Sequence, residues 1–326
     1  MSRHHPATAG GYVLRSAILF LLAAGPFLAG AVHEPVFIPL LAGCALAGVA
    51  AWLRARADAG RGRPVPALPG RRLLLALLSL VLFQLLPLPL GVLRFLSPGS
   101  HAHWTHVLLD PAGAWRPISV SPPDTLRGLA FAIGFSLLYL AVFRELGERP
   151  WRRRLMLTVV LVGVAITVVA LVQSVSAEPR RIYGIWRPRW DWAVFGTYVN
   201  GSHFANYLLM ATALAFGFAA ESLARLRAVW GRRRLGFLAL GDREGNAAIR
   251  FSVAVVVLSA GLVAAGSRGA IGAFLSTLLA LPVLARRRRR AVLGVAVVAA
   301  IGVAWVGLGR FFTALATRGI QHSRID

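Results

Sequence analysis

Charged residues are scarce in this sequence, lysine is absent and only one cysteine occurs. Asp, Glu, Lys and Arg make up 15% of 326 residues and hydrophobic residues 57%, which excludes the usual composition of a soluble domain. The mean hydropathy is +0.67. We interpret the exclusive use of arginine as codon bias. The single Cys44 lies in an apolar run, so no intramolecular disulfide can form and the redox compartment is not indicated.

No internal repeat is visible, and no polar segment is long enough to form a separate soluble domain. About 20 mainly apolar residues are needed to cross a bilayer as a helix, and the sequence holds nine such stretches. They lie at 12–31, 36–53, 73–96, 125–143, 155–176, 202–222, 251–267, 269–285 and 291–309. We therefore predict an all-α integral membrane protein with about nine transmembrane helices in a single polytopic domain, residues 1–326.

The distribution of arginine predicts the orientation of these helices. If the N-terminus is cytoplasmic, 25 of the 36 arginines fall in cytoplasmic segments, while the 12 acidic residues divide equally between the two sides. Such an excess is typical of cytoplasmic loops. The C-terminus and the loops at 97–124 and 177–200 are then periplasmic. Most of the net charge of +24 is then explained by arginines that determine the topology and are attracted to anionic lipid headgroups. Nucleic-acid binding is therefore not the favoured interpretation.

Two local patterns have an alternative interpretation. Arg15 precedes an apolar stretch that ends in the small residues 29–31, which is also typical of a cleaved signal peptide; the charge alternation favours a retained helix. The outer loop 97–124 contains His101, His103 and His106, which are potential metal ligands. Because no cysteine or nearby carboxylate completes a ligand set, we predict an interfacial loop and no metal.

The loop before residue 200 combines arginine with tryptophan on the side where arginine should be rare. Its arginines are Arg180, Arg181, Arg187 and Arg189, and its tryptophans are Trp186, Trp190 and Trp192. Only Glu178 and Asp191 offset the charge. One interpretation is an interfacial loop that touches lipid phosphates nonspecifically. The other is that the arginines hold the anionic group of a lipid-linked substrate, because a guanidinium binds phosphate through two parallel hydrogen bonds.

Arg268 lies between two apolar runs and is flanked by Gly266 and Gly269. A charge at this position costs free energy unless it reaches water, an interface or a partner. It is therefore either an arginine that reaches the interface at an outer turn or a ligand for an anion.

Three stretches resemble the O-antigen ligase and polymerase family. The segment "FGTYVNGSHFANYLLM" at 195–210 is similar to the family motif at a loop-to-helix boundary. The matching residues are Phe195, Gly196, Thr197, Val199, Asn200, His203, Phe204, Ala205 and Leu208. Ser202 and Asn206 depart from it, standing where asparagine and glycine are common. "GSRGAIGAFLSTLLAL" at 266–281 and "RPISVSPPDTLRGL" at 116–129 also resemble family segments, and the resemblance covers roughly residues 110–310.

The resemblance implies transfer of a glycan from an undecaprenyl pyrophosphate carrier to an acceptor hydroxyl at the periplasmic face of the bacterial inner membrane. It implies a pyrophosphate-binding role for Arg268, and it supports Asn200, His203 and the four loop arginines as substrate-binding residues. His203 has the alternative role of a structural hydrogen-bonding residue. The partners implied are a lipid-linked glycan donor, a glycan or lipid acceptor and membrane lipids, without a cofactor.

The family's catalytic base is a histidine in a large periplasmic region, which we expect beyond residue 326; His322 is not assigned this role. We expect the chain to be a truncated or split member of the family. The competing function is a transporter or flippase for an anionic lipid or solute, and a third is a noncatalytic membrane scaffold. The transporter interpretation is less favoured because repeated halves are missing and the arginines gather at one face.

Overall fold

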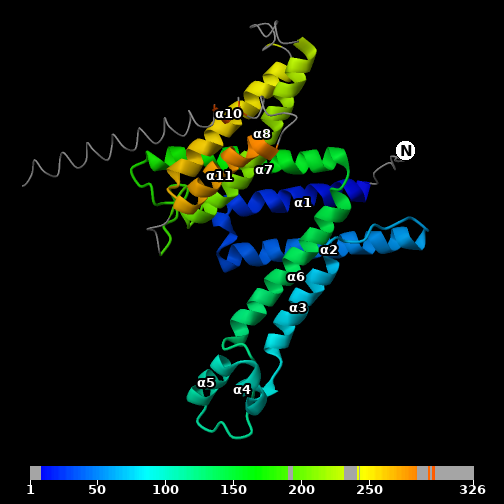
Figure 1. Ribbon diagram of the computed structural model, residues 1–326, viewed down its shortest axis with the longest axis vertical. Coiled ribbons are helices and arrows are strands. Elements are labelled where there is room, and N and C mark those ends of the chain that lie inside the picture. Colours follow the sequence, from blue (N-terminus) through cyan, green and yellow to red (C-terminus); the bar gives the residue numbers. More distant parts are fainter. Residues whose placement is uncertain are drawn as a thin grey trace, which may run out of the picture. The chain divides into compact units, whose positions relative to one another are not determined.

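The computed structural model describes residues 9–189, 194–230, 241 and 243–284, with the isolated positions 293, 296 and 297. This part of the chain is mainly helical (Figure 1). Six of its helices are long and apolar enough to cross a membrane. They are α1 (Ala9–Phe27), α2 (Glu34–Gly60), α6 (Pro122–Glu145), α7 (Arg149–Ser174), α8 (Gly201–Trp230) and α10 (Arg243–Ala264). The predicted helical class is thereby confirmed, and the six helices have the length and composition that a multi-pass membrane protein requires.

Two further elements accompany these helices. The 3-10 helix η1 (Ala29–Ala31) follows α1, and α11 (Arg268–Leu284) corresponds to the predicted span 269–285. The predicted span 291–309 lies outside the described residues. The total of nine crossings and their orientation therefore stay predictions.

The prediction of one continuous helix over 73–96 is wrong. The segment forms α3 (Arg71–Leu85), β1 (Leu88–Pro89) and α4 (Leu90–Leu96), followed by α5 (Pro98–Val107) and β2 (Trp115–Arg116). Pro87 has no amide hydrogen to donate and disfavours helical geometry at the residue before it; Leu86 accordingly has ψ 129°. β1 pairs antiparallel with β2, Leu88 opposite Arg116. Apolar composition predicted a helix here, but proline ended it.

The contacts group the helices into two units, and the described residues of the first unit are 9–21 and 35–152. α2 and α6 approach closely because each helix has a glycine at the contact. A Cβ on Gly48 of α2 would lie 2.4 Å from the Leu137 Cβ on α6, and a Cβ on Gly134 of α6 would lie 2.2 Å from a Leu41 methyl on α2.

α3 lies alongside α6 in the opposite direction. The Tyr139 hydroxyl donates to the Pro69 carbonyl at 3.2 Å, and the Ser119 amide donates to the Gln84 carbonyl at 3.0 Å. Segment 86–121 therefore lies at the end of α6 remote from Glu145, which agrees with the predicted alternation of loops within this unit.

The second unit comprises residues 22–34 and those from 153 onward. Its core forms between α7, α8, α10 and α11, with large buried side chains at Ile166, Phe204, Leu208, Leu258 and Leu262. Glycines again permit close helix contact. A Cβ on Gly163 of α7 would lie 2.8 Å from that of Ala211 on α8, and a Cβ on Gly261 of α10 would lie 2.5 Å from Thr167 Cγ2 on α7.

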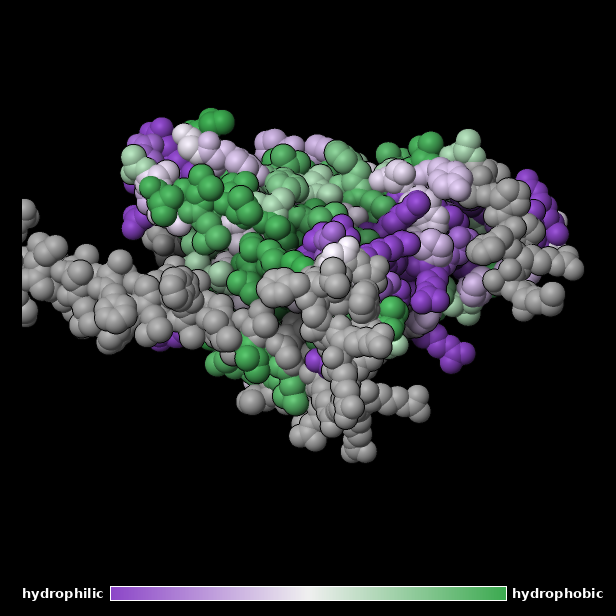
Figure 2. All heavy atoms as spheres, turned by 90° about the horizontal axis from the view of Figure 1, so that it is seen from above, coloured by the Kyte–Doolittle hydropathy of each residue, from purple (hydrophilic) through white to green (hydrophobic). Residues whose placement is uncertain are grey.

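Large apolar side chains cover much of the outer helix surface (Figure 2). Leu73 on α3 is 76% exposed and Leu161 on α7 is 65% exposed. Soluble monomers rarely expose extended apolar surface, and α3 buries none of its residues. These surfaces are suited to contact with lipid chains.

We predict that Ser176 and Ala59 lie on opposite sides of the membrane, with Ser176 periplasmic. Both positions are exposed, so single cysteines there, in a Cys44→Ala background, should be accessible to a membrane-impermeant maleimide. Intact spheroplasts should label Ser176→Cys, whereas Ala59→Cys should label only after permeabilisation. The reverse pattern would contradict the orientation derived from arginine.

Candidate functional site

One end of the second unit gathers the segments that the sequence singled out. At Gly261, α10 faces Thr167 of α7 and Leu208 of α8, so the end of α7, the start of α8 and the end of α10 lie at one level. α11 begins at Arg268, four residues after α10 ends. Residues 175–189, 194–203 and 265–268 therefore belong to the same end of the core (Figure 1). We call these residues the loop end.

The arginine-containing loop is built on a tight backbone turn. Ile182, only 2% exposed, exchanges two backbone hydrogen bonds with Trp186, at 2.8 and 3.2 Å. Between them Tyr183 and Gly184 have φ values of +56° and +71°, as a turn with two left-handed central residues requires. The buried Ile182 thus fixes one side of this turn, whose residues 183–186 are exposed.

Side chains from outside the loop fix its position. The Gln173 amide at the end of α7 donates to the Pro179 carbonyl at 2.9 Å and accepts from the Tyr183 amide at 3.3 Å. The Tyr183 hydroxyl donates to the Phe27 carbonyl. Partial burial raises the pKa of Tyr183 above its usual value, which extends to higher pH the range in which this hydroxyl is a donor.

The motif at 195–198 forms a second tight turn. Phe195 and Tyr198 exchange two backbone hydrogen bonds, at 3.1 and 3.2 Å. Gly196 between them has φ +58°, and a Cβ there would lie 2.6 Å from the Ala170 Cβ. Glycine is required here both for its left-handed backbone and for the close approach to α7.

The other motif residues mainly pack this turn against the core. Thr197 is fully buried and donates to the Pro26 carbonyl at 2.8 Å. Phe204, also fully buried, places its ring edge-on to Phe195 and Tyr198. Most residues that carry the family resemblance therefore position the loop and are not available to a ligand. Gln173 and Thr197 were not predicted as functional residues, because their partners lie on other segments.

Asn200, His203 and Arg268 lie near helix starts. The Asn200 Oδ1 accepts from the Ser202 amide at 2.8 Å, so this side chain caps α8. His203 is exposed in the first turn of α8. Arg268 is exposed at the start of α11, after Gly266 with φ +70°. Within the described part of the chain, its guanidinium has no hydrogen-bond or ion-pair partner.

The loop arginines are largely accessible to solvent. Arg180, Arg187 and Arg189 are exposed. Arg181 forms an ion pair of 2.5 Å with Glu178, and the two side chains are 42% and 56% exposed. Trp186 lies edge-on to His33 with ring centroids 4.6 Å apart. Trp190, Trp192 and Asp191 fall outside the described residues.

The loop end is electropositive. Its described residues include five arginines, counting Arg268, and Glu178 as the one carboxylate. The starts of α8 and α11 add the partial positive charge of two helix N-termini. Amide hydrogens at such termini bind anions. The arrangement can therefore hold an anionic group such as a phosphate.

Comparison with family models, curated proteins and solved structures gives no match. The family resemblance remains a prediction that depends on the motifs alone. Two of them, 195–210 and 266–281, begin in the loop end. The third, 116–129, belongs to the first unit, where the Ser119 hydroxyl contacts the Thr125 hydroxyl at 2.6 Å and the Trp104 indole donates to the Pro117 carbonyl at 2.9 Å.

The three histidines of the predicted outer loop all belong to α5: His101, His103 and His106. Among the described residues, no group of three or more His, Cys, Asp or Glu side chains is close enough to hold a metal ion.

Proposed function

We propose that this chain forms the donor-binding part of a membrane glycan transferase of the O-antigen ligase or polymerase type. The observation that supports this proposal most is the loop end, where five arginines and two helix N-termini are collected at one end of a single helical core. In the predicted topology, the loop end lies on the periplasmic side. A lipid-linked donor could then keep its chain in the membrane and its pyrophosphate among the arginines.

The proposed reaction joins an acceptor hydroxyl to the anomeric carbon of the glycan. The bond from that carbon to the carrier pyrophosphate breaks, and the bonding electrons leave with the pyrophosphate, which gains negative charge. Arginines stabilise this charge without a metal because their own charge is fixed. The acceptor proton passes to a base. The family resemblance assigns the base to a histidine in a large periplasmic region.

The predicted ligands have different roles in this proposal. Arg268 is best suited to the pyrophosphate, because its guanidinium is exposed and unpaired within the described chain. His203 is exposed beside the start of α8 and is suited to a donor contact. Asn200 acts through its cap of α8, since its side-chain oxygen already accepts a hydrogen bond.

A transporter for an anionic lipid or solute is the second candidate. One observation favours it: Glu145 is 5% exposed and Arg15 9% exposed, both within helices long enough to cross a membrane. Buried ionisable groups in such helices often line a transport path. Proteoliposomes separate the candidates, since a transferase forms a glycan–acceptor product and a transporter moves its substrate without making one.

We predict that replacing Arg180, Arg181, Arg187 and Arg189 with glutamine weakens binding of undecaprenyl pyrophosphate at least about tenfold, because each charge-assisted hydrogen bond contributes about 1.5–3 kcal/mol. Binding is measured on purified protein in detergent by microscale thermophoresis.

The matched control replaces four exposed arginines of the predicted cytoplasmic segments: Arg56, Arg71, Arg72 and Arg152. It removes the same charge and should leave binding within about twofold. If both variants lose the same affinity, the loop is an interfacial anchor and not a donor-binding site.

A further inference from the structure

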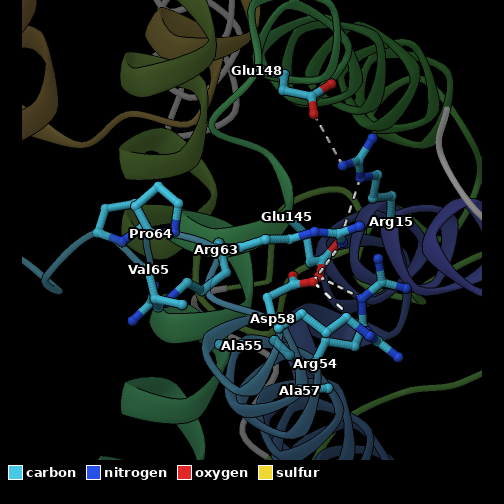
Figure 3. A pocket seen from close by; sticks show the side chains of 14 residues that line it. Arg15, Arg54, Ala55, Ala57, Asp58, Arg63, Pro64, Val65, Glu145 and Glu148 are labelled. Atoms are coloured by element: carbon cyan, nitrogen blue, oxygen red, sulfur yellow. Dashed lines mark hydrogen bonds and ion pairs between the residues drawn. The ribbon is translucent and has the colours of Figure 1, made fainter. Parts of the chain in front are cut away.

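A pocket of about 680 Å³ in the first unit is lined largely by charged side chains (Figure 3). It forms near the start of α1, the end of α2 and the end of α6, which contribute Arg15, Arg54 and Glu145. Segment 61–66, after α2, adds further lining residues. We call it the arginine pocket. None of its residues belongs to the loop end.

The arginine pocket has more positive than negative groups. Its five arginines are Arg15, Arg54, Arg61, Arg63 and Arg144, and its carboxylates number three.

Each of these carboxylates is engaged by arginine. Glu145 pairs with Arg15 at 3.4 Å and with Arg54 at 3.1 Å. Glu148 pairs with Arg15 at 3.3 Å. Arg63 donates a hydrogen bond to Asp58 at 2.8 Å, and Arg61 lies 3.9 Å from the same carboxylate. The lining therefore retains two formal positive charges after its own acids are counted.

Among the described residues, no carboxylate forms an ion pair with Arg144. Its Nε and Nη1 atoms are buried and have no hydrogen-bond partner in the described chain. Buried donors without an acceptor cost free energy, and a guanidinium cannot avoid this cost by losing its proton. A hydrogen-bond acceptor on a bound ligand would remove this free-energy cost.

We propose that the arginine pocket binds a phosphate group. The surplus of positive charge on the lining is suited to an anion, and the oxygens of a phosphate group accept paired hydrogen bonds from guanidinium groups. Figure 3 shows Arg15, Arg54 and Arg63 turned toward Glu145 and Asp58, so several cations already converge on the space that a phosphate would share. The phosphate belongs either to a soluble pyrophosphate-type anion or to the headgroup of an anionic lipid. By the predicted topology this site faces the cytoplasm, and it is independent of the proposed transfer reaction.

The test uses the whole chain reconstituted in phosphatidylcholine nanodiscs. Binding of sodium pyrophosphate is measured by isothermal titration calorimetry. In a parallel arm, retention of phosphatidylglycerol is measured by native mass spectrometry after reconstitution with 10% of that lipid. Arg144→Gln should weaken at least one interaction about tenfold, since it removes a charged donor. Arg63→Gln, at a side chain 48% exposed, should act in the same direction and does not disturb a buried position.

Arg56→Gln is the matched control, because Arg56 lies on α2, is exposed and stacks over Trp52 outside the pocket lining. Glu148→Gln, at a side chain 55% exposed, should strengthen binding about threefold by removing a like charge. A response to pyrophosphate identifies a soluble anion, and a response in lipid retention alone identifies a headgroup. If neither Arg144→Gln nor Arg63→Gln exceeds Arg56→Gln, or if Glu148→Gln weakens binding, the proposal is wrong.

Discussion

Replacing Arg268 with alanine should lower the rate of the proposed glycan transfer about a hundredfold. Arg268 is exposed at the first position of α11, and no side chain of the described chain competes for its guanidinium. Loss of a preorganised donor that meets developing charge costs about 3 kcal/mol of transition-state stabilisation. Arg268→Lys should recover only part of the rate, because an ammonium provides charge without the fork that binds two phosphate oxygens.

The measurement is incorporation of lipid-linked glycan into acceptor by membranes that contain equal amounts of each variant. Arg250→Ala is a suitable control, since Arg250 is exposed on the preceding helix α10, remote from the loop end. A wild-type rate for Arg268→Ala would contradict the assignment of Arg268 to the pyrophosphate of the donor.

Most helices could be predicted because a bilayer requires long apolar runs, and such runs are local in sequence. The predicted span 155–176 corresponds to α7 at Arg149–Ser174, and 202–222 lies within α8 at Gly201–Trp230. The failure at 73–96 has a local cause as well. Leucine surrounds Pro87 and Pro89, so hydropathy stays high where the backbone cannot remain helical.

The sequence also predicts that the candidate site residues lie at one end of the core. Successive helices run in opposite directions, so every second loop lies at the same end. The turns within the loop end could not be predicted in this way. They close through local backbone hydrogen bonds, but their placement on the core depends on hydrogen bonds between distant segments, such as that from Thr197 to the Pro26 carbonyl. No spacing pattern in the sequence marks such a pair.

The arginines of the predicted cytoplasmic side show the same limit more strongly. Their positions were sufficient to predict orientation, and that interpretation left them without individual roles. Arg15 and Glu145 are 130 residues apart in sequence, yet their side chains pair in the folded unit. A charge count cannot distinguish an arginine held in such a network from one that only faces lipid headgroups.

Replacing Glu145 with leucine should destabilise the protein by about 3 kcal/mol. Both carboxylate oxygens are paired, Oε2 with Arg15 at 3.4 Å and Oε1 with Arg54 at 3.1 Å, and the side chain is only 7% exposed. Removing one member of a buried pair leaves an uncompensated charge, which typically costs 3–5 kcal/mol. The lower end is expected because the Arg54 side chain is 37% exposed and reaches water, and because Arg15 keeps its ion pair with Glu148 at 3.3 Å.

A second variant distinguishes the free-energy cost of the unpaired buried charge from the cost of lost packing. Arg15→Met combined with Glu145→Leu removes both buried charges, so it should recover at least about half of the lost stability, as hydrophobic replacement of buried pairs is often neutral. Glu148→Ala, at the 55% exposed partner of Arg15, should change stability by less than about 0.5 kcal/mol. Unfolding is followed by tryptophan fluorescence in mixed micelles of increasing SDS content. If the double variant is as unstable as Glu145→Leu, the cost arises from packing at Glu145, and the ion pairs themselves contribute little to holding α1 against the end of α6.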